Sequence, residues 1–181
     1  MSGNAELRNC KITGNRNGID LNFTSGNNIH NNIIDFNRTG MIFRNQCPNN
    51  TIVENYITNN WTVGVLWLAF STEDATGTVF FNNKIEGNWY TEIENRSLTG
   101  GVKNFSGNWL GSATLTTANT NGSEPGYSLQ IPVEYGGTST PPGGALSVRG
   151  AGISEIDFTP WLGLGTDTDI STGNGIIGFQ G

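Results

Sequence analysis

A pattern of apolar and Asn residues recurs about every 22 positions through the first hundred residues of this chain. When the repeats are aligned, three columns of apolar residues appear. In order, these are Leu7, Ile29, Ile52 and Phe80; Ile12, Ile34, Ile57, Ile85 and Phe105; and Ile19, Met41, Val65 and Ile93. Self-similarity at a fixed period indicates a solenoid, in which each repeat buries its apolar side chains against the next.

Two columns of Asn accompany the apolar columns. The main column, which we expect to form a structural ladder, has steps of 22, 23, 28 and 20 residues and consists of Asn15, Asn37, Asn60, Asn88 and Asn108. The second consists of Asn32, Asn55 and Asn83, with Cys10 in the first repeat. Asn tolerates the left-handed backbone that a sharp turn requires. Stacked strands lie about 4.8 Å apart, so successive Asn amides are expected to hydrogen-bond along the stack.

The period and the alternation of side chains favour an all-β parallel β-helix of about four to five coils. In the first repeat Ile19 and Leu21 are expected to point inward, with Asp20 between them pointing outward. A βαβ repeat needs longer units with helical patterning. Twenty of the first hundred residues are Asn, a poor helix former, which also argues against helices.

The repeat also predicts how the chain is divided. We assign the coils to residues 1–111, with an insertion at 69–77 expected as a loop at one corner. Residues 112–162 are rich in Gly, Ser, Thr and Pro, and are expected to fold back as a cap in the same domain, because an uncovered solenoid end pairs with other chains. Residues 163–181 are predicted to be a linker or the start of a further module. The repeat begins almost at Met1, so we expect the N-terminus to be a cut within a longer protein.

Two short segments of the second half are expected to be strands, at 129–135 and 145–148. Two other segments carry a resemblance to known proteins, namely Asn108-Trp109-Leu110-Gly111-Ser112 and Ile156-Asp157-Phe158-Thr159-Pro160-Trp161-Leu162 followed by Gly165-Thr166-Asp167-Thr168. Together with the coils they resemble the right-handed β-helix repeats of the pectate-lyase-like, NosD-like superfamily. The resemblance implies a right-handed coil, an extracellular or cell-surface location in bacteria and frequent contact with polysaccharide. It implies no single activity, because this fold hosts lyases, hydrolases, epimerases, adhesins and phage tailspikes.

The charge of the chain argues against two kinds of partner. Its net charge of -6 would be repelled by nucleic acid and by an anionic membrane surface. No run of 18 apolar residues is present, so no segment is expected to insert into a membrane. Polysaccharide is the partner that the resemblance implies.

A stripe of cationic and aromatic residues follows the main Asn column, and we expect it to be exposed because it lies at a turn. It consists of Arg16, Arg38, Trp61, Trp89 and Trp109, with Tyr90 in the next column. Aromatic and guanidinium groups stacked in this way are suited to sugar rings and acidic sugars. The alternative is that the Trp side chains pack against loops and the returning C-terminal segment. The leading hypothesis is a non-catalytic module of a larger secreted or surface protein, which binds polysaccharide or mediates adhesion through Arg16, Arg38, Trp61, Trp89 and Tyr90.

An enzymatic alternative rests on two carboxylates. Asp35 and Glu86 belong to one outward column, two coils and therefore about 9.6 Å apart. Inverting glycosidases separate their carboxyl groups by about 6.5–9.5 Å. In this alternative, the chain is a fragment of a carbohydrate-active enzyme, either a polysaccharide lyase or an inverting glycoside hydrolase, and Asp35 and Glu86 are its catalytic residues.

A third alternative is a self-associating structural or phage-tail module. Leu7, Ile12 and Ile19 have no preceding coil over them in this chain, so end-to-end or homo-oligomeric stacking through the N-terminal coil is expected. No cofactor is predicted. The acidic turn at Gly165–Asp169 is the candidate position for a structural Ca²⁺.

Overall fold

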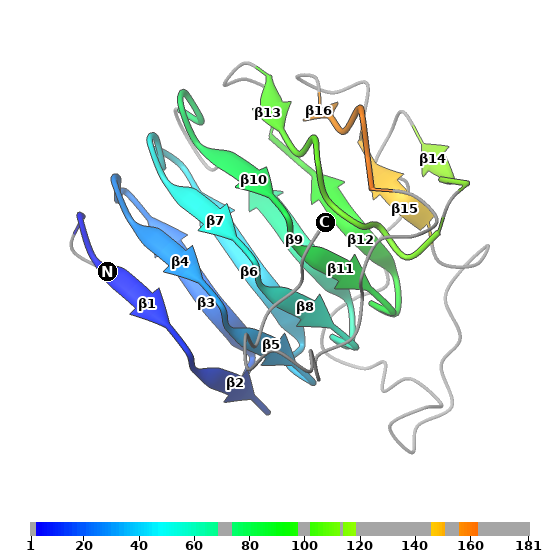
Figure 1. The fold of residues 1–181 in the computed structure, drawn as a ribbon, viewed down its shortest axis with the longest axis horizontal. Coiled ribbons are helices and arrows are strands. Elements are labelled where there is room, and N and C mark those ends of the chain that lie inside the picture. Colours follow the sequence, from blue (N-terminus) through cyan, green and yellow to red (C-terminus); the bar gives the residue numbers. More distant parts are fainter. Residues whose placement is uncertain are drawn as a thin grey trace, which may run out of the picture.

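A computed structural model of the chain describes residues 3–68, 74–97, 102–112, 114–118, 146–150 and 156–162. These residues form an all-β parallel solenoid of about four turns. The strands follow one another as successive rows from the N-terminal end to the other end of the stack (Figure 1). The predicted fold class is confirmed.

Each of the first four coils contributes one strand to each of three sheets, which we call A, B and C, and later segments extend sheets A and C. Sheet A contains β1 (Glu6–Arg8), β4 (Asn28–His30), β7 (Thr51–Val53), β10 (Val79–Phe81), β13 (Lys103–Asn104) and β16 (Ile156–Asp157). Sheet B contains β2 (Lys11–Thr13), β5 (Ile33–Asp35), β8 (Tyr56–Thr58) and β11 (Lys84–Glu86). Sheet C contains β3 (Asn17–Asn22), β6 (Thr39–Arg44), β9 (Val63–Leu68), β12 (Thr91–Asn95), β15 (Leu146–Arg149) and β14 (Thr117–Ala118).

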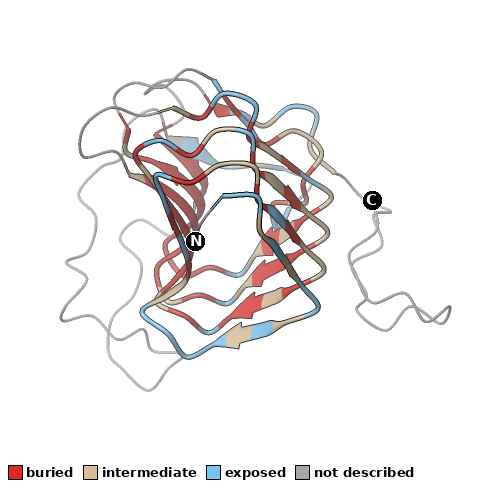
Figure 2. Cartoon of the chain, turned by 90° about the vertical axis from the view of Figure 1, so that its left-hand side faces the viewer, coloured by how far each residue is buried: buried red, intermediate tan, exposed pale blue. Residues whose placement is uncertain are grey.

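The register of these strands matches the apolar columns through four coils. Leu7 lies opposite Ile29, Ile12 opposite Ile34 and Ile19 opposite Met41, and the later coils continue the same pairing. These side chains line the interior and form one buried core, with Leu7 and Ile12 half-buried in the first coil. Figure 2 shows the coils with buried strands behind a more exposed N-terminal coil.

The fifth coil differs from the prediction for Phe105. Asn104 lies opposite Val79, so Phe105 stacks on Phe80, with ring centroids 4.2 Å apart. Phe105 therefore continues the first apolar column, whereas we had placed it in the second. Leu110, which is buried in the core, follows the bridge between Lys84 and Trp109 and takes the place in the second column.

The assignment of Asn108 to the main ladder is also wrong. The backbone N–H and Nδ2 of Asn83 both donate to Oδ1 of Asn108, at 3.0 and 2.8 Å, so Asn108 continues the second Asn column. Trp109 accordingly lies opposite Lys84 and does not extend the column of Arg16 and Arg38. The sequence is ambiguous here because in both columns an apolar residue precedes the Asn by three positions.

Glycine is required where sheet C begins in each of the first three coils. A Cβ atom on Gly40 would lie 2.6 Å from the carbonyl oxygen of Gly64 and 2.8 Å from Nδ2 of Asn60. Contacts this short exclude a side chain pointing in this direction. Gly18 and Gly64 are equally crowded, so the backbone approaches the Asn ladder closely in three successive coils.

Segments beyond the repeat extend two of the sheets. Val148 in β15 lies opposite Ile93 and is buried, and β16 pairs with β13 in sheet A. Strand β15 corresponds to the strand predicted at 145–148. The predicted strand at 129–135 and the predicted linker at 163–181 lie outside the described residues, as does most of the predicted loop at 69–77. The assignment of residues 112–162 to the same domain stays a prediction.

The N-terminal coil ends all three sheets. Strands β1, β2 and β3 each have one strand partner among the described residues, and their outer edges face away from the stack. Unpaired edges with half-buried apolar side chains are suited to pairing with another chain. We therefore expect the isolated chain to self-associate with rising concentration in sedimentation velocity experiments.

An Ile12→Lys substitution is expected to abolish this self-association, because it places a charge on the edge and in the end of the core. Val102→Lys is the control, since Val102 is 53% exposed and does not belong to the N-terminal coil. A chain that stays monomeric at all concentrations, or equal association by both variants, would rule out stacking through this coil.

Candidate functional site

The main Asn ladder lies at the corner between sheets B and C. Asn37 and Asn60 each donate through Nδ2 to the Oδ1 of the next Asn, at 3.3 and 2.8 Å. Each Oδ1 also accepts the backbone N–H of the preceding coil, as in Asn60 N to Asn88 Oδ1 at 3.0 Å. The predicted ladder is confirmed for Asn15, Asn37, Asn60 and Asn88, and its polar groups are satisfied in the interior.

A further ladder at the third corner was not predicted. Asn27 donates through Nδ2 to Oδ1 of Asn50 at 2.7 Å, and the backbone N–H of Asn50 donates to Oγ1 of Thr78. Asn27 and Asn50 precede β4 and β7 by the same number of residues. That repeated spacing was the signal that could have identified this ladder from the sequence.

Glu92 terminates the main ladder. It lies beside Gly64, in the position that glycine occupies in the first three coils. The backbone N–H and Nδ2 of Asn88 both donate to Oε2 of Glu92, at 3.3 and 2.5 Å. A carboxyl group thus takes the place of the next Asn amide. Sequence reasoning assigned Glu92 no role, because it looked for the ladder among Asn residues only.

Burial raises the pKa of Glu92 to about 8. The hydrogen bonds from Asn88 lower this pKa and the nearby Glu86 raises it, but loss of solvent has the largest effect. The carboxyl group of Glu92 is therefore mainly neutral at pH 7. We place its proton on Oε1, because Oε2 already accepts two N–H groups.

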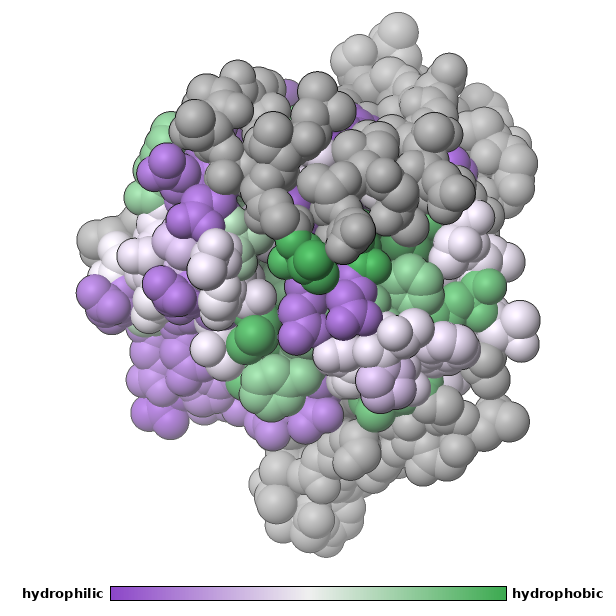
Figure 3. All heavy atoms as spheres, turned by 90° about the horizontal axis from the view of Figure 1, so that it is seen from above, coloured by the Kyte–Doolittle hydropathy of each residue, from purple (hydrophilic) through white to green (hydrophobic). Residues whose placement is uncertain are grey.

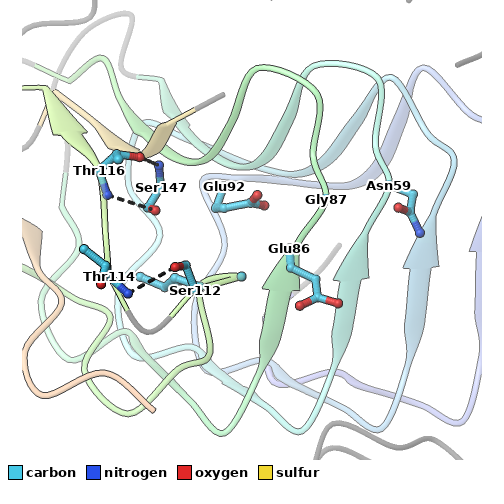
Figure 4. Close-up of a pocket in the computed structure, with 10 residues that line it drawn as sticks. Asn59, Glu86, Gly87, Glu92, Ser112, Thr114, Thr116 and Ser147 are labelled. Atoms are coloured by element: carbon cyan, nitrogen blue, oxygen red, sulfur yellow. Dashed lines mark hydrogen bonds between the residues drawn. The ribbon is translucent and has the colours of Figure 1, made fainter. Parts of the chain in front are cut away.

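Glu92 borders a cleft of about 370 Å³ at the end of the ladder (Figure 4). Its lining is mostly polar and consists of Asn59, Glu86, Gly87, Glu92, Leu110, Gly111, Ser112, Thr114, Thr116 and Ser147. We call this the ladder cleft. Glu86 is held by Nζ of Lys84 at 2.8 Å and by Nε1 of Trp109 at 2.5 Å. The cleft therefore combines a neutral carboxyl group, a carboxylate in an ion pair and several hydroxyl groups.

The two carboxylates proposed for catalysis occupy one column. Asp35 lies opposite Thr58, and Thr58 lies opposite Glu86, so the two acids are two strands apart with Thr58 between them. Asp35 is buried and pairs with Nζ of Lys11 at 3.3 Å. The ladder cleft includes Glu86 but not Asp35. Their use in catalysis stays a prediction.

A second hollow, of about 220 Å³, lies on the outer face of sheet C. Its lining consists of Arg16, Asn17, Arg38, Thr39, Ile42, Arg44, Leu66 and Leu68. We call this the arginine groove. Two of its cations, Arg16 and Arg38, belong to the predicted binding stripe. The third, Arg44, was missed, although it lies two positions after Ile42 in β6 and therefore on the same outward face.

The aromatic part of the predicted stripe is arranged differently. Trp61 is half-buried, whereas Trp89 is 6% and Tyr90 is 1% exposed. Trp89 and Tyr90 pack in a cluster on sheet C, and the guanidinium of Arg149 lies 4.0 Å from the centre of the Tyr90 ring. The expected exposure is wrong for Trp89 and Tyr90, because the turn into β12 folds them onto the outer face of the sheet.

In the view from above, hydrophobic residues form several groups separated by hydrophilic ones (Figure 3). Among the described residues there is no group of three or more His, Cys, Asp and Glu that could hold a metal ion. The candidate Ca²⁺ turn at Gly165–Asp169 lies outside them. The described residues contain no helix that could span a membrane.

The model of one protein family, the right-handed β-helix region, matches residues 1–110. The chain belongs to the right-handed β-helix family. The matched residues contain the first four coils and most of the fifth, which agrees with the sheets described above. No curated protein and no solved structure matches the chain. Membership of the β-helix family establishes the fold, while the ligand has to be argued from the residues of the site.

Proposed function

We propose that this β-helix is a non-catalytic module that binds acidic polysaccharide through the arginine groove, within a larger secreted or cell-surface bacterial protein. The observation that supports the proposal most strongly is the gathering of Arg16, Arg38 and Arg44 around one groove. The chain has only nine Lys and Arg residues and a net charge of -6. A cationic groove on an acidic protein favours an anionic ligand at that place.

The chemistry of the groove fits sugars that carry carboxylate or sulfate groups. Arg16 and Arg38 belong to successive coils, so their backbones lie about 4.8 Å apart. Guanidinium groups form forked hydrogen bonds with such anions. Leu68 is half-buried and supplies an apolar surface beside the cations, against which the C–H face of a sugar ring packs, while the buried Ile42 and Leu66 lie beneath it. Arg16 is exposed, which leaves the groove open to solvent at that end.

Arg44 has a supporting part in this arrangement. Its Nε lies 3.0 and 3.1 Å from the two carboxylate oxygens of Asp20, which neutralises much of its charge. Arg44 is therefore expected to contribute less of its charge to attraction of the ligand. Adhesion to a surface polysaccharide would use the same contacts.

The double substitution Arg16→Gln with Arg38→Gln is expected to weaken binding of polygalacturonate at least tenfold. Each of the two charged hydrogen bonds contributes up to about 1.5–3 kcal/mol to the free energy of binding. A loss of about 1.4 kcal/mol lowers the affinity tenfold. Isothermal titration calorimetry at low salt measures the effect. Binding by the unmodified chain should weaken as salt is raised, because exposed charges are screened.

Arg8→Gln is the matched control, since Arg8 is an exposed arginine of β1 that lies outside the groove and pairs with Glu6. Affinity equal to that of the unmodified chain in the double variant would overturn the proposal. Release of reducing ends or unsaturated products, abolished by Asp35→Asn, would instead favour the enzyme alternative.

A further inference from the structure

We propose that the ladder cleft is a second binding site, for an uncharged ligand rich in hydroxyl groups such as a neutral sugar unit. The proposal concerns a different site and a different ligand charge from the arginine groove. The cleft is of the size of small-molecule sites, which range over roughly 300–1,000 Å³. It is built by the fourth coil, which supplies Glu86 and Glu92, and by later segments that supply Ser112 and Ser147.

The hydroxyl groups of the cleft retain their protons for a ligand. Oγ of Ser112 accepts the backbone N–H of Thr114 at 3.1 Å. Oγ of Ser147 accepts the N–H of Thr116, and Oγ1 of Thr116 accepts the N–H of Ser147, both at 3.3 Å (Figure 4). Each oxygen is thus fixed as an acceptor, and within the described residues none of the three O–H groups donates. A wall of oriented, unused O–H donors is suited to the oxygens of a sugar.

Glu92 supplies a further polar group that points into the cleft. The residue is only 7% exposed, and its Oε2 is engaged by Asn88. Its Oε1 has no hydrogen-bond partner within the part of the chain that the structure describes. A Cβ atom on Gly111, a residue of the cleft wall, would lie 3.9 Å from this Oε1. Gly111 therefore lies beside this oxygen in the wall of the cleft.

The charges of the cleft favour a neutral ligand. Glu86 repels an anion such as a uronate, so the acidic sugars expected in the arginine groove are disfavoured here. A cation is disfavoured by Lys84, whose Nζ is already on Glu86, and by the neutral state of Glu92. A hydroxyl group suits both acids, because it can accept from Glu92 and donate to Glu86.

The test is a titration of the whole chain with neutral sugars at pH 7. The probes are glucose, galactose and N-acetylglucosamine, together with cellobiose and lactose, observed by saturation-transfer NMR and calorimetry. At least one neutral sugar is expected to bind, and galacturonate is expected to leave the cleft unoccupied. If a disaccharide binds more tightly than a monosaccharide, the ligand is the end of a sugar chain. If the two bind equally, the ligand is a free monosaccharide. Both results support the site.

Substitutions separate this site from the groove. Glu86→Gln is expected to weaken neutral-sugar binding about tenfold, the usual effect of losing a hydrogen bond to a charged group. Glu54→Gln is the matched control, because Glu54 is a half-buried glutamate outside the cleft. The double substitution Arg16→Gln with Arg38→Gln is expected to leave neutral-sugar binding unchanged, because both arginines lie outside the cleft.

Three results would overturn the proposal. The first is that no neutral sugar binds to the folded chain. The second is that Glu86→Gln does not weaken the binding of a neutral sugar. The third is that the chain binds Ca²⁺ and that Glu86→Gln removes this binding. Failure of polygalacturonate binding alone would affect only the arginine groove. The two sites can therefore be accepted or rejected independently.

Discussion

Replacing Asn55 with alanine is expected to lower the free energy of unfolding by about 3–5 kcal/mol, because several buried polar groups lose their partners together. Oδ1 of Asn55 accepts the backbone N–H and Nδ2 of Asn32, at 3.1 and 3.0 Å. Its Nδ2 donates to the carbonyl of Ile29 at 2.8 Å and to Asn83 at 3.0 Å. Asn55 is fully buried, so water cannot replace these bonds.

Urea denaturation followed by circular dichroism measures this effect. Asn28→Ala is the control, because Asn28 is an exposed residue of β4 outside the ladders, and its substitution is expected to change stability by less than about 0.5 kcal/mol. Equal stability of the two variants would mean that the Asn columns mark turns without contributing bonds to the folded state.

The second large effect concerns Glu92 and pH. The pKa of Glu92 in the folded chain, about 8, lies above its ordinary value of 4.5. Between these values the folded state keeps a proton that the unfolded state releases. This contribution to stability is therefore complete below pH 4.5 and is lost progressively as pH rises towards 8. At about 1.36 kcal/mol per pKa unit, the loss is roughly 5 kcal/mol.

Glu92→Gln isolates this contribution, because the amide keeps an acceptor for Asn88 and cannot ionise. The variant and the unmodified chain are expected to be similarly stable at pH 4. Above pH 8 the variant should be more stable, by an amount approaching roughly 5 kcal/mol. Denaturation curves between pH 4 and pH 9 measure the difference, and other titrating groups cancel in the comparison. Two parallel curves would show that Glu92 is ionised in the folded chain at neutral pH.

The sequence was most informative where one residue recurs in one environment. Ile12, Ile34, Ile57 and Ile85 meet the same interior position in each coil, so the period alone gave their register. Asn37 and Asn60 were predictable for the same reason, since only a stacked partner satisfies an amide inside a solenoid. Local repetition of this kind carries three-dimensional information because neighbouring coils are structurally equivalent.

The prediction failed where that equivalence ends. Asn108 fitted either of two corners, because both have an apolar residue three positions before an Asn, and only strand pairing distinguished them. Trp89 and Tyr90 follow the same ladder position as Arg16 and Arg38, yet they are buried against the outer face of sheet C. Position around the coil specifies the direction of the backbone, whereas exposure depends on what lies next to each side chain.

The sequence by itself determined that this protein is a stack of parallel β-coils, with Ile and Asn columns along a common axis, because the repeat specifies contacts between residues one coil apart. Only the tertiary structure decided where the groove and the cleft lie. Both depend on residues that break the repeat. Arg44, which has Asn22 and Leu68 at its place in the neighbouring coils, joins Arg16 and Arg38 in the groove, and Glu92 takes the place of a glycine beside Ser147 from a segment beyond the repeat. Such residues have no equivalent one coil away, so the period does not predict their neighbours.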